Sequence, residues 1–178
     1  MANAIDLSNI ITLKPFKESH IDDVLLWLSD DRVLKNTRME SCNSKEEALN
    51  FIKNKWIYPT YQSICLDGHS IGILWVLPYN DEKHKACLGY AIGFMYWGHG
   101  IVTKALKILL SKVFQEFNGL VRLEAYTVVE NKASQRVLEK VGFHREGLLR
   151  KFFYHKGNVE DFYVFSFLNT DEVFDVVA

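Results

Sequence analysis

Cysteine and proline are scarce in this sequence, which has three of each among 178 residues. The cysteines, Cys42, Cys65 and Cys87, are odd in number, far apart and without a CxxC pair, which excludes the framework of a disulfide-rich fold. The six histidines are scattered as well, and none stands at metal-ligand spacing from a cysteine or another histidine. We therefore expect free, mostly buried thiols, a reducing compartment and no bound metal.

An excess of charge and a long apolar run are also missing. The formal net charge is -1, whereas a chain that binds nucleic acid usually has a strongly basic face. No segment reaches the roughly 20 apolar residues of a membrane helix. Met1 to Ser8 lack the basic region and apolar stretch of a secretory signal. These absences predict a cytoplasmic protein with neither a nucleic-acid nor a membrane partner.

Apolar residues, in contrast, are plentiful. They make up 48% of the chain and include 12 Phe and 8 Tyr. A chain of this length buries roughly 70% of the surface that it exposes when unfolded, which is enough for a hydrophobic core. The length predicts one domain over residues 1–178.

The hydrophobic pattern changes along the chain between the helical period and the strand period. It predicts, in order, a strand at 10–13, helices at 19–28 and 44–56, strands at 61–66, 70–77 and 86–92, a helix at 102–117, a strand at 120–128, a helix at 131–141 and strands at 143–155 and 159–168. Ser44 and Glu47 fit a capping box at the second helix, and Asp67-Gly68 fits the turn of a hairpin. This order predicts a mixed α/β sheet in one layer with helices on its faces.

A glycine-rich loop follows the strand at 86–92. Gly98 and Gly100 let the backbone approach a ligand closely, and the first turn of the next helix has free N–H groups at the positive end of its dipole. These features favour a phosphate site, and the alternative is a loop that only joins strand to helix. The other phosphate loops do not fit, because Thr103 stands where G-x-G-x-x-G needs its third glycine and no G-K-[ST] is present.

Four segments at matching spacing resemble the GNAT superfamily of N-acetyltransferases, and within it the RimJ/RimL-like branch. They are YWGHGIVTKA at 96–105, RLEA at 122–125, NKASQRVLEKVGF at 131–143 and EGLLR at 146–150. Trp97 and Val102 depart from the superfamily pattern, which has Arg or Gln and Gly or Ala at these places. The resemblance covers about residues 10–168. It implies a single-domain fold of the α/β (α+β) class, with a mostly antiparallel central sheet of about six to seven strands, splayed in the middle, and helices on both faces.

The resemblance also implies that acetyl-CoA is the cosubstrate and binds where the strands at 86–92 and 120–128 splay apart. The pantetheine arm would pair with backbone at Ile92 and Gly93, and the pyrophosphate would lie on amides of the glycine-rich loop. Asn131 would bond the arm, although capping of its helix is the simpler reading. The implied cofactor residues are Ile92, Gly93, Trp97, Gly98, His99, Gly100, Ile101, Val102, Thr103, Asn131 and Ser134.

Acetyl transfer needs a neutral amine, a stabilised carbonyl oxygen and a thiolate that can leave. Many GNAT enzymes protonate the thiolate with a Tyr in the sequence L-Y-E-K, but this chain has Leu138 there. Ser134 is therefore our candidate for assisting the thiolate. Tyr90, on the strand at 86–92, is interpreted as a core residue.

Which group removes the amine proton is left open by the sequence. Glu124 and Tyr126 are the candidates, and they share a strand face with Arg122 because alternate residues point the same way. Alternatively, Glu124 has no catalytic role and simply forms an ion pair with Arg122. In the RimJ/RimL-like branch the slot for a catalytic Glu falls on Phe153 here, so a chain of water molecules is a further alternative.

The resemblance implies an amine acceptor, either a protein N-terminal amine or a small amine, and a monomer or homodimer. A second hypothesis is a catalytically weak acyl-CoA-binding or interaction module on the same fold. The absent Tyr and carboxylate favour that module, whereas the intact pair of Asn131 and Ser134 favours the enzyme.

Overall fold

The computed structural model describes residues 11–56 and 60–173. Met1 to Ser8, in which no secretory signal is predicted, and Ile10, the first residue of the first predicted strand, lie outside the described residues.

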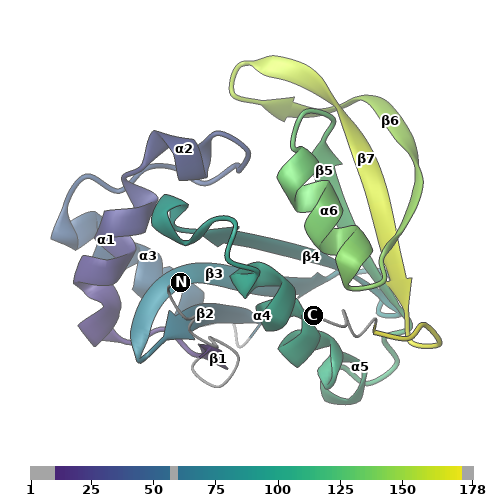
Figure 1. The fold of residues 1–178 in the computed structure, drawn as a ribbon, viewed down its shortest axis with the longest axis horizontal. Helices are drawn as coiled ribbons and strands as arrows, with labels where there is room; N and C mark the ends of the chain where they lie inside the picture. The colour runs from purple at the N-terminus through teal and green to yellow at the C-terminus, as the bar shows by residue number, and fades with distance from the viewer. Residues whose placement is uncertain (1–10, 57–59, 174–178) are drawn as a thin grey trace, which may run out of the picture.

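Seven strands form one sheet in the order β1-β2-β3-β4-β5-β7-β6 (Figure 1). They are β1 (Ile11–Lys14), β2 (Tyr61–Leu66), β3 (His69–Pro78), β4 (Lys85–Ile92), β5 (Arg122–Val128), β6 (His144–His155) and β7 (Asn158–Leu168). Neighbouring strands are antiparallel except for β4 and β5, which are parallel. The predicted mixed, mostly antiparallel sheet is therefore confirmed.

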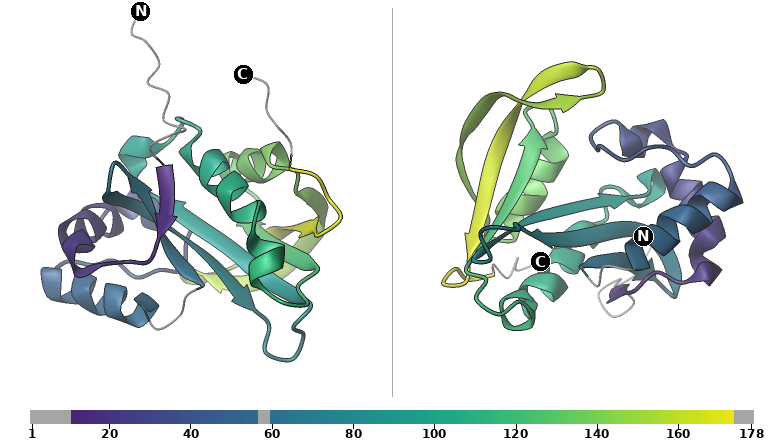
Figure 2. Two further views of the ribbon diagram at one scale, coloured as in Figure 1. Left: turned by 90° about the horizontal axis from the view of Figure 1, so that it is seen from below. Right: turned by 180° about the vertical axis from the view of Figure 1, so that it is seen from behind.

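Helices cover both faces of this sheet (Figure 2). They are α1 (Ile21–Leu28), α2 (Asp31–Leu34), α3 (Lys45–Trp56), α4 (Ile101–Leu110), α5 (Val113–Glu116) and α6 (Lys132–Lys140). Leu88 and Ile92 of β4 belong to the core formed with α4 and α6, whereas Ala91 belongs to the core formed with α1 and α3. We call the two sides the α4–α6 face and the α1–α3 face. Successive strand residues alternate between them.

The parallel pair of β4 and β5 is incomplete. Pairing covers only Lys85–Cys87 and Arg122–Glu124, although β4 continues to Ile92 and β5 to Val128. We call the diverging parts after Cys87 and Glu124 the splay, and Figure 1 shows β5 leaving the direction of β4 there. This confirms that the sheet is splayed in the middle.

The prediction of one helix at 102–117 is wrong in one respect, because the structure has two helices there, α4 and α5. The break falls at Ser111 and Lys112, where Lys112 has φ -135. The Ser111 hydroxyl donates to the Ile108 carbonyl oxygen at 2.8 Å, a local bond of the kind that competes with continued helix.

The short helix α2 was not predicted. Four residues carry too little periodicity, but Asp30 is an N-cap that sequence inspection could have found, because its carboxylate accepts from the Arg32 N–H at 2.9 Å. At α3 the predicted capping box forms with one change. Ser44 Oγ accepts from Glu47 N at 3.2 Å, but Glu47 reaches back to the N–H of Asn43 rather than of Ser44.

Candidate active site

The backbone of β4 turns alternate residues toward the splay. Gly93 N donates to Ile71 O of β3 at 2.8 Å, so Gly93 and, two residues earlier, Ala91 face β3. The backbone groups of Tyr90 and Ile92 therefore point the other way, toward the place where β5 has diverged. An extended ligand can hydrogen-bond to this edge as an added strand.

The backbone of Gly93 bonds within the fold. Its N–H is bonded to Ile71, and its carbonyl accepts from Tyr96 N at 3.0 Å. Both backbone groups of Gly93 thus already have partners within the fold. That Ile92 and Gly93 pair with a ligand stays a prediction.

Trp97 closes the end of the same edge. Its indole Nε1 donates to Ile92 O at 2.9 Å. Its ring is tilted against Phe94 at 5.1 Å between centroids, and the Arg32 guanidinium lies 3.6 Å from the centroid of Phe94. Trp97 therefore connects the glycine-rich loop to the end of β4, and Phe94 connects Trp97 to the α2 segment, roles that the sequence did not indicate.

The glycine-rich loop enters α4 through two left-handed residues, Gly98 with φ 80 and Gly100 with φ 71. Gly100 is the N-cap of α4 and has no side-chain cap bond. Lys104 N donates to Gly100 O, so the amides of Ile101, Val102 and Thr103 precede the first intrahelical bond. His99 is exposed beside them. These amides can hold a phosphate.

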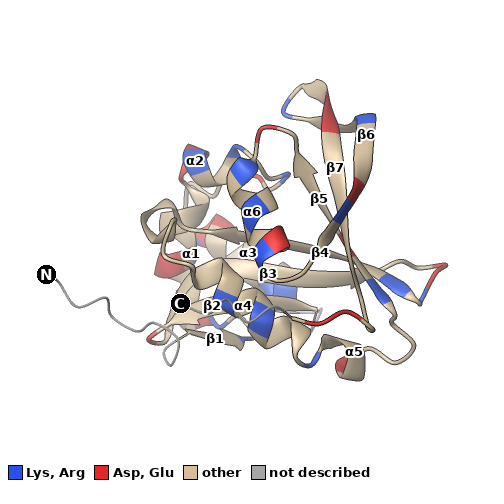
Figure 3. Cartoon of the chain, turned by 45° about the vertical axis from the view of Figure 1, so that its right-hand side comes forward, with Lys and Arg blue, Asp and Glu red and all other residues tan. Residues whose placement is uncertain are grey.

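Basic residues accompany this helix end. Figure 3 shows Lys and Arg on α4 and α6. Helix α4 contains two lysines and no acidic residue, and α6 contains three basic residues and one Glu. This side of the molecule therefore suits an anionic ligand.

The start of α6 places two hydroxyl groups together. Asn131 caps the helix, because its Oδ1 accepts from Ser134 N at 3.1 Å. Ser134 Oγ lies 2.7 Å from the phenol oxygen of Tyr90, which also donates to Ser134 O at 3.3 Å. Burial raises the pKa of Tyr90 well above its usual value. Tyr90 was interpreted as a core residue, and its contact with Ser134 depends on a long-range register that the sequence does not reveal.

A second polar group lies on the other face of the sheet. Glu124 is 8% exposed, and one of its oxygens accepts from Arg122 Nε at 2.8 Å. Its other oxygen accepts from the phenols of Tyr126 at 2.7 Å and Tyr79 at 3.0 Å. The shared face of Arg122, Glu124 and Tyr126 is confirmed, and Tyr79 is an addition that sequence reasoning missed.

The ionisation of this group disfavours base catalysis by its own side chains. Burial raises the pKa of Glu124, but the hydrogen bonds from Tyr126, Arg122 and Tyr79 outweigh burial and leave it below its usual value. Burial also raises the pKa of Tyr79 to about 12 and that of Tyr126 further. Glu124 is thus a carboxylate with its lone pairs largely used, and the two phenols stay protonated at neutral pH.

Aromatic rings line the same side. Phe152 is stacked on Tyr126 at 5.4 Å, and Phe153 meets Tyr126 edge-on at 5.8 Å. The Arg38 guanidinium lies 4.6 Å from the centroid of Phe153. Phe153 thus stands beside Tyr126, and the place where relatives were expected to have a Glu is apolar.

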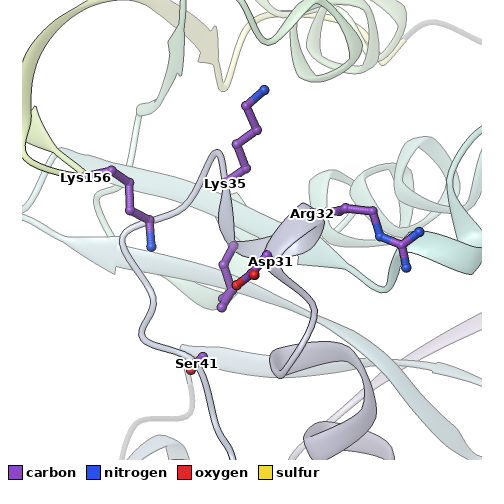
Figure 4. Close-up of a pocket in the computed structure, with 6 residues that line it drawn as sticks. Asp31, Arg32, Lys35, Ser41 and Lys156 are labelled. Carbon is purple, nitrogen blue, oxygen red and sulfur yellow. The ribbon is translucent and has the colours of Figure 1, made fainter.

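A hollow of about 560 Å³ lies between α2 and the β6–β7 turn. In Figure 4 Arg32 points away from Lys35 and Lys156, and it is bonded to Asp30 at 2.6 Å. These basic side chains therefore do not converge on one anion. Among the described residues no His, Cys, Asp and Glu side chains group as metal ligands, and within 11–56 and 60–173 no helix has the length and apolarity to cross a membrane.

Known proteins share both the sequence pattern and the fold. Residues 11–144 match the family model described as acetyltransferase (GNAT) domain. The chain is 26% identical over 177 residues to the uncharacterized N-acetyltransferase YoaA of Bacillus subtilis (strain 168), covering 91% of this chain and 95% of the relative.

Two solved structures are similar throughout. A GNAT-family acetyltransferase from Bacillus anthracis superposes with a TM-score of 0.80 at 25% identity, covering 89% of this chain and 95% of that one. RimL, the ribosomal L7/L12 alpha-N-protein acetyltransferase in complex with coenzyme A, gives 0.78 at 21% identity, covering 92% and 97%. The chain belongs to the GNAT family of acyl-CoA-dependent N-acetyltransferases.

Proposed function

We propose that this chain transfers an acetyl group from acetyl-CoA to a primary amine in a ternary complex, with the thioester held in the splay. The hydroxyl pair of Ser134 and Tyr90 carries this proposal. Ser134 lies at the start of α6, and Tyr90 lies on β4, whose backbone at Tyr90 and Ile92 faces the splay. The glycine-rich loop then joins β4 to the amides of Ile101–Thr103.

The cofactor and the amine approach from opposite faces in this proposal. The phosphates lie at the start of α4, and the arm pairs with Ile92 and with Asn131. The acceptor lies on the α1–α3 face, beside Tyr126 and Glu124. Because pairing of β4 with β5 ends at Cys87 and Glu124, the amine can reach the thioester between the strands.

The amine nitrogen attacks the thioester carbon, so an N–C bond forms and the C–S bond breaks with its electron pair going to sulfur. Ser134 Oγ donates a hydrogen bond to the departing thiolate and keeps its proton, Tyr90 orients Ser134 through their hydrogen bond, and the thiolate takes a proton from water. Water on the acceptor side takes the proton of the amine. The phenol oxygens of Tyr79 and Tyr126 retain lone pairs that can accept from the amine N–H groups. Tyr79, Tyr126 and Glu124 therefore position the acceptor and do not deprotonate it.

The acceptor is a protein N-terminal amine or a small amine, handled by a monomer or a homodimer. We place the reaction in the cytoplasm. The three cysteines, which are free in the structure, support a reducing compartment.

Release of free thiol from acetyl-CoA across libraries of peptides and small amines tests the proposal. We expect release that depends on an amine and falls in Ser134→Ala. Ser111→Ala, which removes a hydroxyl at the far end of α4, should retain the wild-type rate. Saturable acetyl-CoA binding without release for any amine would indicate a binding module, and absence of both would reject the cofactor assignment.

A further inference from the structure

The Thr127 hydroxyl is buried without a partner. Thr127 is 4% exposed, and its Oγ1 is among the few buried side-chain oxygens of the described residues with no hydrogen-bond partner. A buried hydroxyl of this kind destabilises a fold, and native structures therefore rarely keep one without a reason.

Elsewhere in this sheet, a buried hydroxyl bonds across a strand pair. On β2 and β3 the buried Ser63 Oγ donates to Ser70 Oγ at 2.8 Å. Thr127 pairs with Tyr163 of β7 on one side of β5, whereas on the other side β4 has diverged. No β4 residue therefore pairs beside this hydroxyl.

Register and alternation fix the side of the sheet on which Thr127 lies. Leu123 and Ala125 belong to the core of the α4–α6 face, so Thr127 points to that face. The pairing of Lys85 with Arg122, continued along both strands, places Thr127 level with Tyr90. The hydroxyl therefore lies across the splay from the residue that contacts Ser134.

Hydrogen bonds hold the start of α6 against the end of β5. The buried Gln135 donates from Nε2 to Val128 O at 3.2 Å and to Val129 O at 2.9 Å. Because Asn131 and Ser134 precede Gln135 on the same short segment, Gln135 ties them to the end of β5. Thr127 therefore lies on the α4–α6 face near the end of β5, to which Gln135 ties the start of α6.

We propose that the Thr127 hydroxyl donates a hydrogen bond to the sulfur of the acyl-CoA arm, as a second donor beside Ser134. This inference rests on the proposed function, because it needs the arm in the splay. The bond is weak to the thioester and stronger to the thiolate, on which negative charge develops. Thr127 transfers no proton, and the hydroxyl that destabilises the free protein gains its partner from the cofactor.

Thr127→Val keeps the shape of the side chain and removes the hydroxyl. We expect its thermal midpoint to rise, because an unsatisfied buried group is lost, and its affinity for CoA to fall about tenfold. Affinity for desulfo-CoA, which lacks the sulfur, should be the same in wild type and Thr127→Val. Thr127→Ser should restore CoA binding. Equal affinity of wild type and Thr127→Val for CoA would overturn the inference.

Proximity is tested separately, without activity. Thr127→Cys should form a mixed disulfide with one CoA per chain when incubated with CoA disulfide, as measured by intact mass. Val128→Cys is the matched control, because Val128 is 3% exposed and Thr127 4%, and strand alternation turns Val128 to the opposite face. The wild-type protein, treated in the same way, shows how far the three native thiols react with CoA disulfide. Failure of Thr127→Cys to react above these controls would contradict the placement.

The two tests separate this inference from the proposed function. If wild type binds CoA and desulfo-CoA with equal affinity, the sulfur has no donor and the inference is wrong while the cofactor assignment stands. If wild type binds neither, both are wrong.

Discussion

The polar side chains around the splay form two groups, one on each face of the sheet. Ser134 and Tyr90 share a hydrogen bond of 2.7 Å on one face, and Tyr126 and Tyr79 hold Glu124 on the other. In the proposed function, the first group lies at the leaving sulfur and the second at the amine acceptor.

Ser134→Ala should lower kcat with little change in KM for acetyl-CoA, because its hydroxyl matters most as charge builds on sulfur. One positioned hydrogen bond of this type is worth on the order of 10- to 1,000-fold in rate. Tyr90→Phe should lower kcat less, since it leaves the Ser134 hydroxyl in place. Steady-state kinetics under conditions where chemistry limits turnover measure both. An unchanged kcat in Ser134→Ala would leave that residue as a helix residue only.

Asn131→Ala should change stability as well as turnover. Asn131 Oδ1 accepts from Ser134 N at the start of α6, and loss of an N-cap costs about 1 kcal/mol. Denaturant unfolding should therefore separate Asn131→Ala from Ser134→Ala, which keeps the cap. Equal stability of Asn131→Ala and wild type would contradict the capping role.

Acid should weaken one ion pair in particular. Glu146 accepts from Arg122 Nη1 at 2.9 Å and from Ser166 Oγ at 2.6 Å, and the Arg122 bond is the main cause that lowers the pKa of Glu146 to about 2. A carboxyl with a lowered pKa stabilises the fold above its unfolded pKa of 4.5 and loses this contribution as pH falls toward 2.

Glu146→Gln should therefore have a lower thermal midpoint than wild type at pH 7, and the difference should shrink as pH falls below 4.5. Glu116→Gln is the control, because it removes only an exposed pair with Lys112, which is worth little. A difference between Glu146→Gln and wild type that stays constant from pH 7 to pH 3 would contradict the assignment.

Among the elements, the start of α4 has the most specific backbone requirement. Gly100 has φ 71, and a Cβ added there meets no atom within 4 Å. A side chain at Gly100 is therefore strained by the backbone but not by its neighbours, and it enters the space that we assign to phosphate.

Gly100→Val should weaken acetyl-CoA binding at least about tenfold, a loss of about 1.4 kcal/mol. Gly119→Val is the matched control, since Gly119 has φ 82, also has no atom within 4 Å, and follows α5. The two variants should lose similar stability, but only Gly100→Val should lose affinity in a calorimetric titration. Equal affinity of the two variants would contradict the phosphate site.

The strands and the longer helices could be predicted from the sequence, because each has a clear period and local end signals. The helix cap at Asn131 and the left-handed backbone at Gly100 could be predicted too, because each depends only on neighbouring residues. The break in α4–α5 was not predictable from periodicity, since Val113 and Phe117 continue the same helical stripe. Tyr90 and Tyr79 could not be placed either, because their contacts join residues more than 40 positions apart.

At the scale of the whole molecule, the two cores and the incomplete β4–β5 pair produce a sheet with different chemistry on its two faces. The α4–α6 face has the helix start, the hydroxyls and the basic helices, whereas the α1–α3 face has the Glu124 group and the aromatic rings. The motifs that resemble the family cover the starts of α4 and α6 and also Arg122 and Glu124 of β5. Tyr79, which follows β3, and the rings of β6 join Glu124 only in the folded chain, so one sequence does not identify an acceptor.

The central claim is that the splay between β4 and β5 holds the acyl-CoA arm, and amide hydrogen exchange with and without acetyl-CoA tests it most directly. The amides of Tyr90 and Ile92 face the splay, and those of Ala91 and Gly93 face β3. We predict that acetyl-CoA slows exchange at Tyr90, Ile92 and the amides of Ile101–Thr103, and changes Ala91 and Gly93 much less. Slowed exchange confined to other parts of the chain, or equal slowing of all four β4 amides, would contradict the account.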